Sequence, residues 1–236
     1  MAETTSPTLY GALLDLDGTL LDTEPLSDIA LNQVLEPHGA AMNVAVKNTI
    51  VGTAAPDWSA YLVKVFELEG KVTPKEIVAG WDAAMAKLTP TVAVMPGALE
   101  LMAAFRDAGV PMSLCTSSKA SSVAVKESTK ADMFSLFSAR VCGDDAELKN
   151  GKPAPDIFLL GAKRLGLDPT TCVVFEDSEA GMQAGKLAGC FVVGVVPEPS
   201  GDISRFQADI LVASMADIVV TPVNGGGVTL STTASL

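Results

Sequence analysis

The sequence predicts an α/β fold in which a parallel β-sheet is covered by helices and carries a helical block inserted after its first strand. From Met95 onward, helical patterns alternate with short runs rich in Val, Leu and Cys, which is typical of a parallel sheet. Residues 25–90 have helical periodicity and no convincing strand. Because the apolar run at residues 9–14 precedes that block, the block is predicted to be an insertion into the core.

The individual elements follow from the same patterns and from the Gly, Pro and Asn residues that separate them. The predicted strands are residues 9–14, 111–115, 138–142, 172–175 and 191–195, with a weaker candidate at 210–212. The predicted helices of the inserted block lie near residues 25–37, 56–69 and 74–88. We therefore expect a core of residues 1–23 and 95–222 and a helical cap of residues 24–94, placed to act as a lid. The Gly-, Ser- and Thr-rich tail, residues 223–236, has little apolar content and is predicted to be disordered.

Composition limits the partners that this chain can bind. Its 236 residues carry a net charge of −12, whereas nucleic acids and anionic membranes require clustered Lys and Arg. The apolar runs are far shorter than the roughly 20 residues that cross a bilayer. The amino terminus is polar and acidic, without the basic and apolar regions of a signal peptide, which predicts a cytoplasmic protein. We expect a monomer with a small-molecule ligand, and an anionic ligand would need a local basic pocket.

The four cysteines do not suggest a metal centre. Cys115, Cys142, Cys172 and Cys190 are dispersed, form no Cys-x-x-Cys pair, and lie in or beside apolar runs. The single histidine, His38, is in a different region of the chain. We therefore expect reduced thiols packed in the core rather than a metal cluster or a nucleophilic thiol.

The most informative segment follows the first predicted strand. Asp15 and Asp17 are two residues apart, and alternate residues of a strand point the same way, so both carboxylates are expected at the carboxyl end of that strand. Gly18 allows a sharp turn that keeps both acids at the rim. One acid can attack while the other moves protons, which is a signature of phosphoryl transfer. The alternative is a solvated acidic turn.

Two later strands are followed by groups that suit a phosphate. Thr116 and Ser117 follow the strand at residues 111–115, and their hydroxyl and backbone amide groups at a helix start can bind phosphate oxygens. Their alternative role is an ordinary helix cap. Lys152 lies in a Gly-Lys-Pro run ahead of a helix and can meet a phosphate as a point charge. Taken alone, it would be interpreted as a solvated loop lysine.

A second acidic pair, Glu176 and Asp177, lies at the end of another strand. Two acidic strand ends favour a cation, because carboxylate oxygens, a backbone carbonyl and waters form the octahedron that Mg²⁺ prefers. Capping of the following helix by Ser178 is compatible with this interpretation. The expected metal ligands are among Asp15, Asp17, Glu176 and Asp177.

The order of these residues resembles the haloacid dehalogenase superfamily, in the branch with a helical cap after the first motif, and the match covers nearly the whole chain. The residues that carry it are Asp15-x-Asp17-Gly18-Thr19, Thr116, Lys152 and Glu176-Asp177. The stretch from Gly143 to Phe158 resembles pseudouridine-monophosphatase-like and beta-phosphoglucomutase-like members. The resemblance implies a Rossmann-like core with an inserted α-helical cap.

The resemblance also implies a role for each residue. Asp15 would attack phosphorus to form an aspartyl-phosphate, and Asp17 would protonate the leaving oxygen and then activate water. The backbone carbonyl of Asp17 would also bind Mg²⁺. The transferring oxygens would be held by Thr116, Ser117 and Lys152. The implied activity is that of a Mg²⁺-dependent phosphatase acting on a small phosphorylated metabolite.

The residues argue against four alternatives. A dehalogenase of the same fold needs no acid at the second position, so Asp17 argues against it, and a transport ATPase would need a membrane segment. A sugar-phosphate mutase shares the core motifs, but related mutases have a His and an Arg in the cap where this chain has Ser27 and Ala55. A non-catalytic binding module would not need the complete set of acids.

The substrate stays open at this level. Trp58, Tyr61 and Trp81 are interpreted either as cap core or as the lining of a sugar or base pocket, with core favoured by their helical spacing. Phosphorylated sugars, polyols, nucleosides and glycolate all fit the core motifs.

Overall fold

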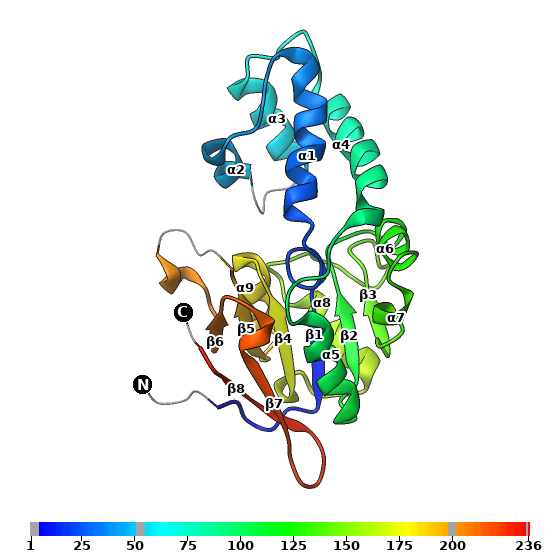
Figure 1. Cartoon of the computed structure of the whole chain (residues 1–236), viewed down its shortest axis with the longest axis vertical. Helices are drawn as coiled ribbons and strands as arrows, with labels where there is room; N and C mark the ends of the chain where they lie inside the picture. The colour runs from blue at the N-terminus through cyan, green and yellow to red at the C-terminus, as the bar shows by residue number, and fades with distance from the viewer. Residues whose placement is uncertain (1–4, 51–54, 198–201, 235) are drawn as a thin grey trace. The chain divides into compact units, whose positions relative to one another are not determined.

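The chain divides into two compact units. The computed structural model describes residues 5–50, 55–197, 202–234 and 236 (Figure 1). One unit comprises Met1–Asp22 and Ala93–Leu236, and the other comprises Thr23–Val92. The second unit is thus inserted in the sequence of the first.

The larger unit is built on a six-stranded parallel sheet, which confirms the predicted α/β, Rossmann-like core. The strands are β1 (Gly11–Leu14), β2 (Met112–Cys115), β3 (Ala139–Val141), β4 (Cys172–Glu176), β5 (Phe191–Val195) and β6 (Ile210–Val212). Their spatial order is β3-β2-β1-β4-β5-β6, and every neighbouring pair is parallel. The chain therefore leaves β1 toward one edge and returns to its other side at β4. This reversal makes a topological switch point between β1 and β4, where ligands bind in open parallel sheets.

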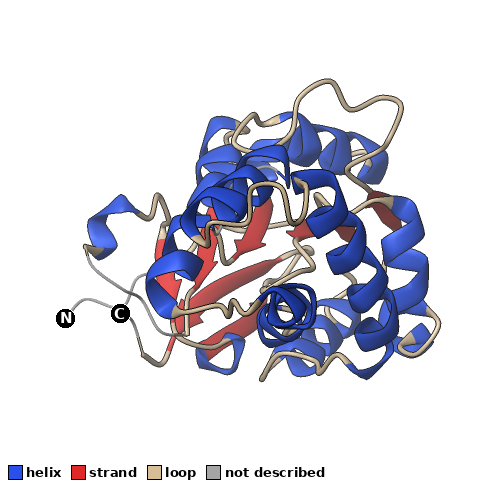
Figure 2. Cartoon of the chain, turned by 90° about the horizontal axis from the view of Figure 1, so that it is seen from above, coloured by secondary structure: helices blue, strands red, loops and turns tan. Residues whose placement is uncertain are grey.

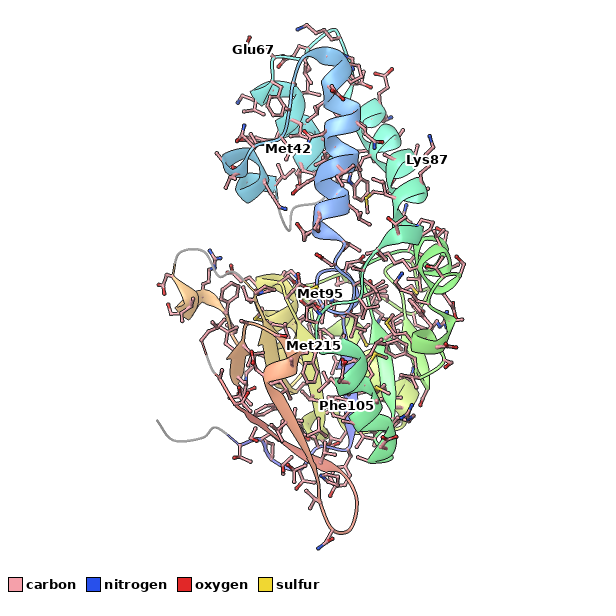
Figure 3. The ribbon with its side chains drawn as sticks, in the orientation of Figure 1. Met42, Glu67, Lys87, Met95, Phe105 and Met215 are labelled. Atoms are coloured by element: carbon pink, nitrogen blue, oxygen red, sulfur yellow. The ribbon has the colours of Figure 1, made fainter. Side chains whose placement is uncertain are left out.

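Helices cover both faces of this sheet (Figure 2). They are α5 (Ala98–Asp107), α6 (Ala120–Glu127), α7 (Ala131–Phe134), α8 (Asp156–Leu165) and α9 (Glu179–Leu187), with short 3₁₀ turns η3 (Pro169–Thr171), η4 (Ile203–Arg205) and η5 (Met215–Asp217). On one face, Leu13 of β1 and Val174 of β4 pack with Phe158 of α8. On the other face, the ring of Phe175 meets that of Phe105 on α5, labelled in Figure 3, with 5.9 Å between centroids. Strands buried on both sides explain the nearly continuous apolar runs of the sequence.

Among its described residues, the inserted unit has helices and connecting loops and no strand. It contains α1 (Glu24–Leu35), η1 (Glu36–His38), α2 (Val44–Ile50), α3 (Ala55–Val65), α4 (Pro74–Leu88) and η2 (Thr89–Thr91). Helix α4 begins with a capping box: the Thr73 hydroxyl accepts from the Glu76 amide, and the Glu76 carboxylate accepts from the Thr73 amide at 2.8 Å. Pro74 at the first turn lacks the amide that would be unpaired there. Helix α2 lies outside the three predicted segments.

The aromatic residues of the inserted unit belong to its apolar core. Trp58 and Trp81 meet edge to face, with ring centroids 5.8 Å apart. Both rings, and that of Tyr61, are partly buried against the buried side chains of α1, α3 and α4. The indole N–H of Trp81 donates to the Ser27 hydroxyl at 3.1 Å. These contacts support the core interpretation of the three aromatic residues.

The prediction of a disordered tail is wrong for the described residues. β7 (Ile218–Pro222) and β8 (Val228–Thr232) form an antiparallel hairpin, and Leu9 exchanges backbone hydrogen bonds with Val228. The glycines at 225–227, which contributed to the prediction of disorder, have positive φ values of 95°, 104° and 79° and form the turn. Val228 and Leu230 are fully buried, because alternation along β8 places both on one face. Two well-placed apolar side chains and long-range pairing are enough to dock this segment.

The other composition-based predictions concern the cysteines and the membrane. All four cysteines are unpaired and buried, as predicted. Within the described ranges, no helix combines the length and the apolar character needed to cross a bilayer.

We expect Leu230→Ala to lower the free energy of unfolding by about 2–4 kcal/mol, because it removes a fully buried leucine side chain. The matched control is Thr221→Ala on the exposed side of the same hairpin, for which the loss should stay below about 1 kcal/mol. Urea unfolding of both variants measures the difference. Equal stability of the Leu230→Ala variant and the wild type would mean that the hairpin does not dock in solution.

Candidate active site

The candidate site is at the switch point of the sheet. Leu14 pairs with Phe175 across β1 and β4, so the residues that follow them are neighbours. The Asp15 amide donates to the Phe175 carbonyl at 3.1 Å, and Glu176 is the last residue of β4. The sheet therefore brings an acid from each of two central strands to the same edge.

A buried lysine joins these two acids. The Lys152 ammonium lies 2.5 Å from Asp15 Oδ1, also contacts Glu176 Oε1, and donates to the Cys115 carbonyl at 3.3 Å. The side chains of Lys152, Asp15 and Glu176 are 7%, 8% and 1% exposed. Lys152 is thus part of the predicted site and already has two anionic partners there, whereas a solvated loop lysine would have none.

Burial and charge shift the pKa values of these groups strongly. Burial raises the pKa of Asp15 to about 7; the Lys152 charge opposes this rise, and the Glu176 charge adds to it. Burial alone would lower the pKa of Lys152, but the two carboxylates outweigh it, and the pKa is raised. Burial and the charges of Glu176 and Asp15 raise the pKa of Asp177 well above its ordinary value. One ammonium does not balance three carboxylates, so the site favours an additional cation.

The three carboxylates are close enough to share such a cation. Ligand oxygens of Asp15, Glu176 and Asp177 all lie within 4.8 Å of one another. The buried Thr19 hydroxyl donates to Asp177 Oδ1 at 2.9 Å and lies 3.3 Å from Asp15 Oδ2, which fixes both side chains. Gly18 has φ +83°, and a Cβ there would be 2.2 Å from Asp177 Oδ2. The glycine is therefore needed both for the turn and for the position of this carboxylate.

Both carboxylate oxygens of Glu176 are already held by neighbouring protein groups. Its second oxygen, Oε2, accepts from the amide and the hydroxyl of Ser178, at 2.9 and 2.8 Å. A Cβ at Gly181 would collide with its carboxyl group at 1.9 Å. With Lys152 on one oxygen and Ser178 on the other, Glu176 primarily holds the lysine. Asp15 and Asp177 are better suited to hold a metal ion.

Asp17 has different neighbours. Its Oδ1 accepts from the Lys126 ammonium at 2.5 Å, and its Oδ2 accepts from the Ser118 hydroxyl at 2.7 Å and lies 3.5 Å from the Thr116 hydroxyl. Its carboxylate is not among the three clustered acids. Asp17 follows β1, which ends at Leu14, and its charge adds to the raised pKa of Asp15, so the two carboxylates lie near the same strand end. A role for its backbone carbonyl in metal binding stays a prediction.

The hydroxyl groups that follow β2 have different surroundings. Thr116 is buried, and its hydroxyl accepts from the Ser118 amide at 3.0 Å. Ser117 is exposed, and the hydroxyl of the neighbouring Ser118 donates to Asp17. The binding of phosphate by Thr116 and Ser117 stays a prediction. The sequence interpretation also missed Lys126, since a lysine on an amphipathic helix is usually expected in solvent.

Comparison with known proteins identifies the family. The model of the haloacid dehalogenase-like hydrolases matches residues 11–189. The "Probable pseudouridine-5'-phosphatase" of Drosophila melanogaster is 38% identical over 209 residues, covering 87% of this chain and 89% of the relative. Hexitol phosphatase A of Escherichia coli is 30% identical over 231 residues, covering 92% and 97% of the two chains.

Solved structures agree with this assignment. The structure of a "putative beta-phosphoglucomutase from Thermotoga maritima" superimposes with a TM-score of 0.71 and 27% identity, covering 89% of this chain and 96% of that one. The residues matched by the family model include Asp15, Lys152 and Glu176. The chain therefore belongs to the haloacid dehalogenase-like hydrolases and is a phosphoric monoester hydrolase of that family.

Proposed function

We propose that this chain is a Mg²⁺-dependent phosphatase that hydrolyses a small phosphorylated metabolite through an aspartyl-phosphate on Asp15. The observation that carries the proposal is the buried Asp15 carboxylate, held by Lys152 and flanked by Asp177. The substrate class is a sugar, polyol or nucleoside phosphate. The relatives named for hexitol and pseudouridine phosphates support this range.

The residues present fit a magnesium ion. Asp15 and Asp177 would hold it together with the backbone carbonyl of Asp17, all through oxygen atoms, which suits a hard cation. When bound, the ion would offset the repulsion between the Asp15 carboxylate and an anionic phosphate ester. Glu176 would contribute by holding Lys152 in place.

The reaction follows from the roles of the two aspartates. An oxygen of Asp15 attacks phosphorus, the bond from phosphorus to the ester oxygen breaks, and that oxygen takes a proton from the Asp17 carboxyl group. The Asp17 carboxylate then takes a proton from water as the water attacks the aspartyl-phosphate. The bond from phosphorus to Asp15 breaks, and inorganic phosphate leaves. Thr116, Ser117 and Lys152 would stabilise the oxygens of the transferring group.

Asp15→Asn should lower phosphatase activity by about 10³-fold or more, because an amide cannot form the aspartyl-phosphate. The measurement is phosphate release from glycerol 3-phosphate, glucose 6-phosphate and uridine 5′-monophosphate with Mg²⁺ present. Thermal unfolding of the same preparation checks that the fold is retained. Turnover by this variant at the wild-type rate would contradict the assigned nucleophile.

Asp177→Asn should raise the melting temperature of the metal-free protein at pH 7.5. Because the pKa of Asp177 is raised on folding, the native state holds its proton more tightly than the unfolded state does. Stability is therefore lost as the pH rises from the ordinary value through the raised pKa, and an uncharged amide avoids that loss. The Thr19 hydroxyl can still donate to the amide oxygen.

The same variant should lose the stabilisation that Mg²⁺ gives to the wild type, which is about 2.7 kcal/mol at one hundred times the dissociation constant. Thermal unfolding with a chelator tests the higher melting temperature of the metal-free variant, and thermal unfolding with Mg²⁺ tests the lost stabilisation by the ion. The exposed control Asp82→Asn should behave like the wild type. An equal Mg²⁺-dependent shift in Asp177→Asn would exclude Asp177 as a ligand.

A mutase is the second candidate, since the Thermotoga maritima neighbour is described as a beta-phosphoglucomutase. The absence of a His and an Arg at Ser27 and Ala55 favours water as the acceptor. Glucose 1-phosphate, with and without a bisphosphate primer, should therefore yield inorganic phosphate and no glucose 6-phosphate. Primer-dependent isomer formation with little phosphate release would favour the mutase.

A further inference from the structure

Lys126 is a buried cation to which the proposed mechanism assigns no role. Its side chain is 3% exposed, and its ammonium contacts Asp17 Oδ1 at 2.5 Å and the Ser118 hydroxyl at 3.1 Å. Within the described part of the chain its one ion pair is with Asp17, whose side chain is 32% exposed. Burying an ammonium costs free energy unless it is paired, so a lysine in this position depends on Asp17, and Asp17 is in turn held by it.

The geometry of α6 explains how Lys126 reaches the site. Val123 and Lys126 are three residues apart on the helix and are its two buried residues. Side chains of a helix lean toward its amino terminus, which here directly follows the loop after β2. A lysine in the last turn therefore extends back toward that loop, where Ser118 lies eight residues earlier in the chain.

We propose that Lys126 is a positioning residue: with Ser118, it fixes the Asp17 carboxyl group in the orientation from which it exchanges protons with the leaving oxygen and with water. The inference rests on the proposed phosphatase function. The Lys126 ammonium forms no hydrogen bond with Asp15, Glu176 or Asp177. It contacts Asp17 directly, and its other partner, the Ser118 hydroxyl, also donates to Asp17. Each oxygen of Asp17 is held by a different group, Lys126 on Oδ1 and Ser118 on Oδ2. General-acid catalysis requires such fixed geometry, because the proton must be within hydrogen-bond reach of the ester oxygen.

The dependence on the leaving group separates this role from a structural one. An alkoxide must be protonated as it leaves, whereas p-nitrophenolate leaves as an anion. Lys126→Met keeps the aliphatic stem and removes the charge. In this variant kcat/KM should fall by about 10–100-fold for the fastest of the three alkyl phosphates named above and by less than about threefold for p-nitrophenyl phosphate.

A double variant tests whether Lys126 acts through Asp17. In an Asp17→Asn background, Lys126→Met should cause no further loss of kcat/KM for either ester, because the group that it positions is already absent. The matched control Lys130→Met removes a nearby lysine whose ammonium contacts only Thr129 among the described residues. That control should retain wild-type kcat/KM for both esters.

An equal loss for both esters, or no loss for the alkyl phosphate, would overturn the proposal. If Lys126→Met does not unfold cooperatively, Ser118→Ala decides instead, with an expected loss of about 3–10-fold for the alkyl phosphate only. An equal effect of Ser118→Ala on both esters would then count against the proposal. Wild-type protein that hydrolyses neither ester would refute the proposed function itself, whereas activity on both without the predicted difference would refute only the role of Lys126.

Discussion

The buried ammonium of Lys152 is the charge on which the candidate site depends. Asp15 directly follows β1 and Glu176 ends the adjacent parallel strand β4, so without a cation between them the two buried carboxylates would repel each other strongly. A buried ion triad is weak evidence for stability, because hydrophobic groups of the same volume often stabilise as well or better. The triad is therefore better explained by function: it keeps Asp15 in place and leaves its other oxygen, Oδ2, beside Thr19 and the Asp177 carboxylate.

A second lysine gives the two aspartates different surroundings. Asp15 is buried with Lys152, whereas Asp17 is one-third exposed and meets Lys126 and Ser118. The two carboxylates are only two positions apart in the chain but have different environments. Different environments are the usual means by which enzymes give distinct roles to paired acids. Asp15 comes directly after β1, whereas Asp17 comes directly before the turn at Gly18, so the two side chains meet different neighbours.

Local pattern was sufficient for the sheet and for the strand-end acids, but not for features that depend on distant partners. The strands at 111–115 and 191–195 are recognisable because burial on both faces requires apolar runs. The β7–β8 hairpin is not recognisable from its own sequence, because its docking depends on the pairing of Val228 with Leu9, more than two hundred residues earlier. The same limit applies to Lys126, whose burial depends on Asp17 rather than on its own helix.

The acidic cluster also bears on how stability is distributed in the larger unit. The raised pKa values of Asp15 and Asp177 indicate that ionisation of these two carboxyl groups opposes folding when no cation is bound. That cost is confined to one edge of the sheet, while Val174, Phe158 and their neighbours form a fully buried core beneath it. A core that is stable without the site tolerates an acidic cluster that lowers the free energy of unfolding. The residues of the cluster can then be selected for cation binding and catalysis alone.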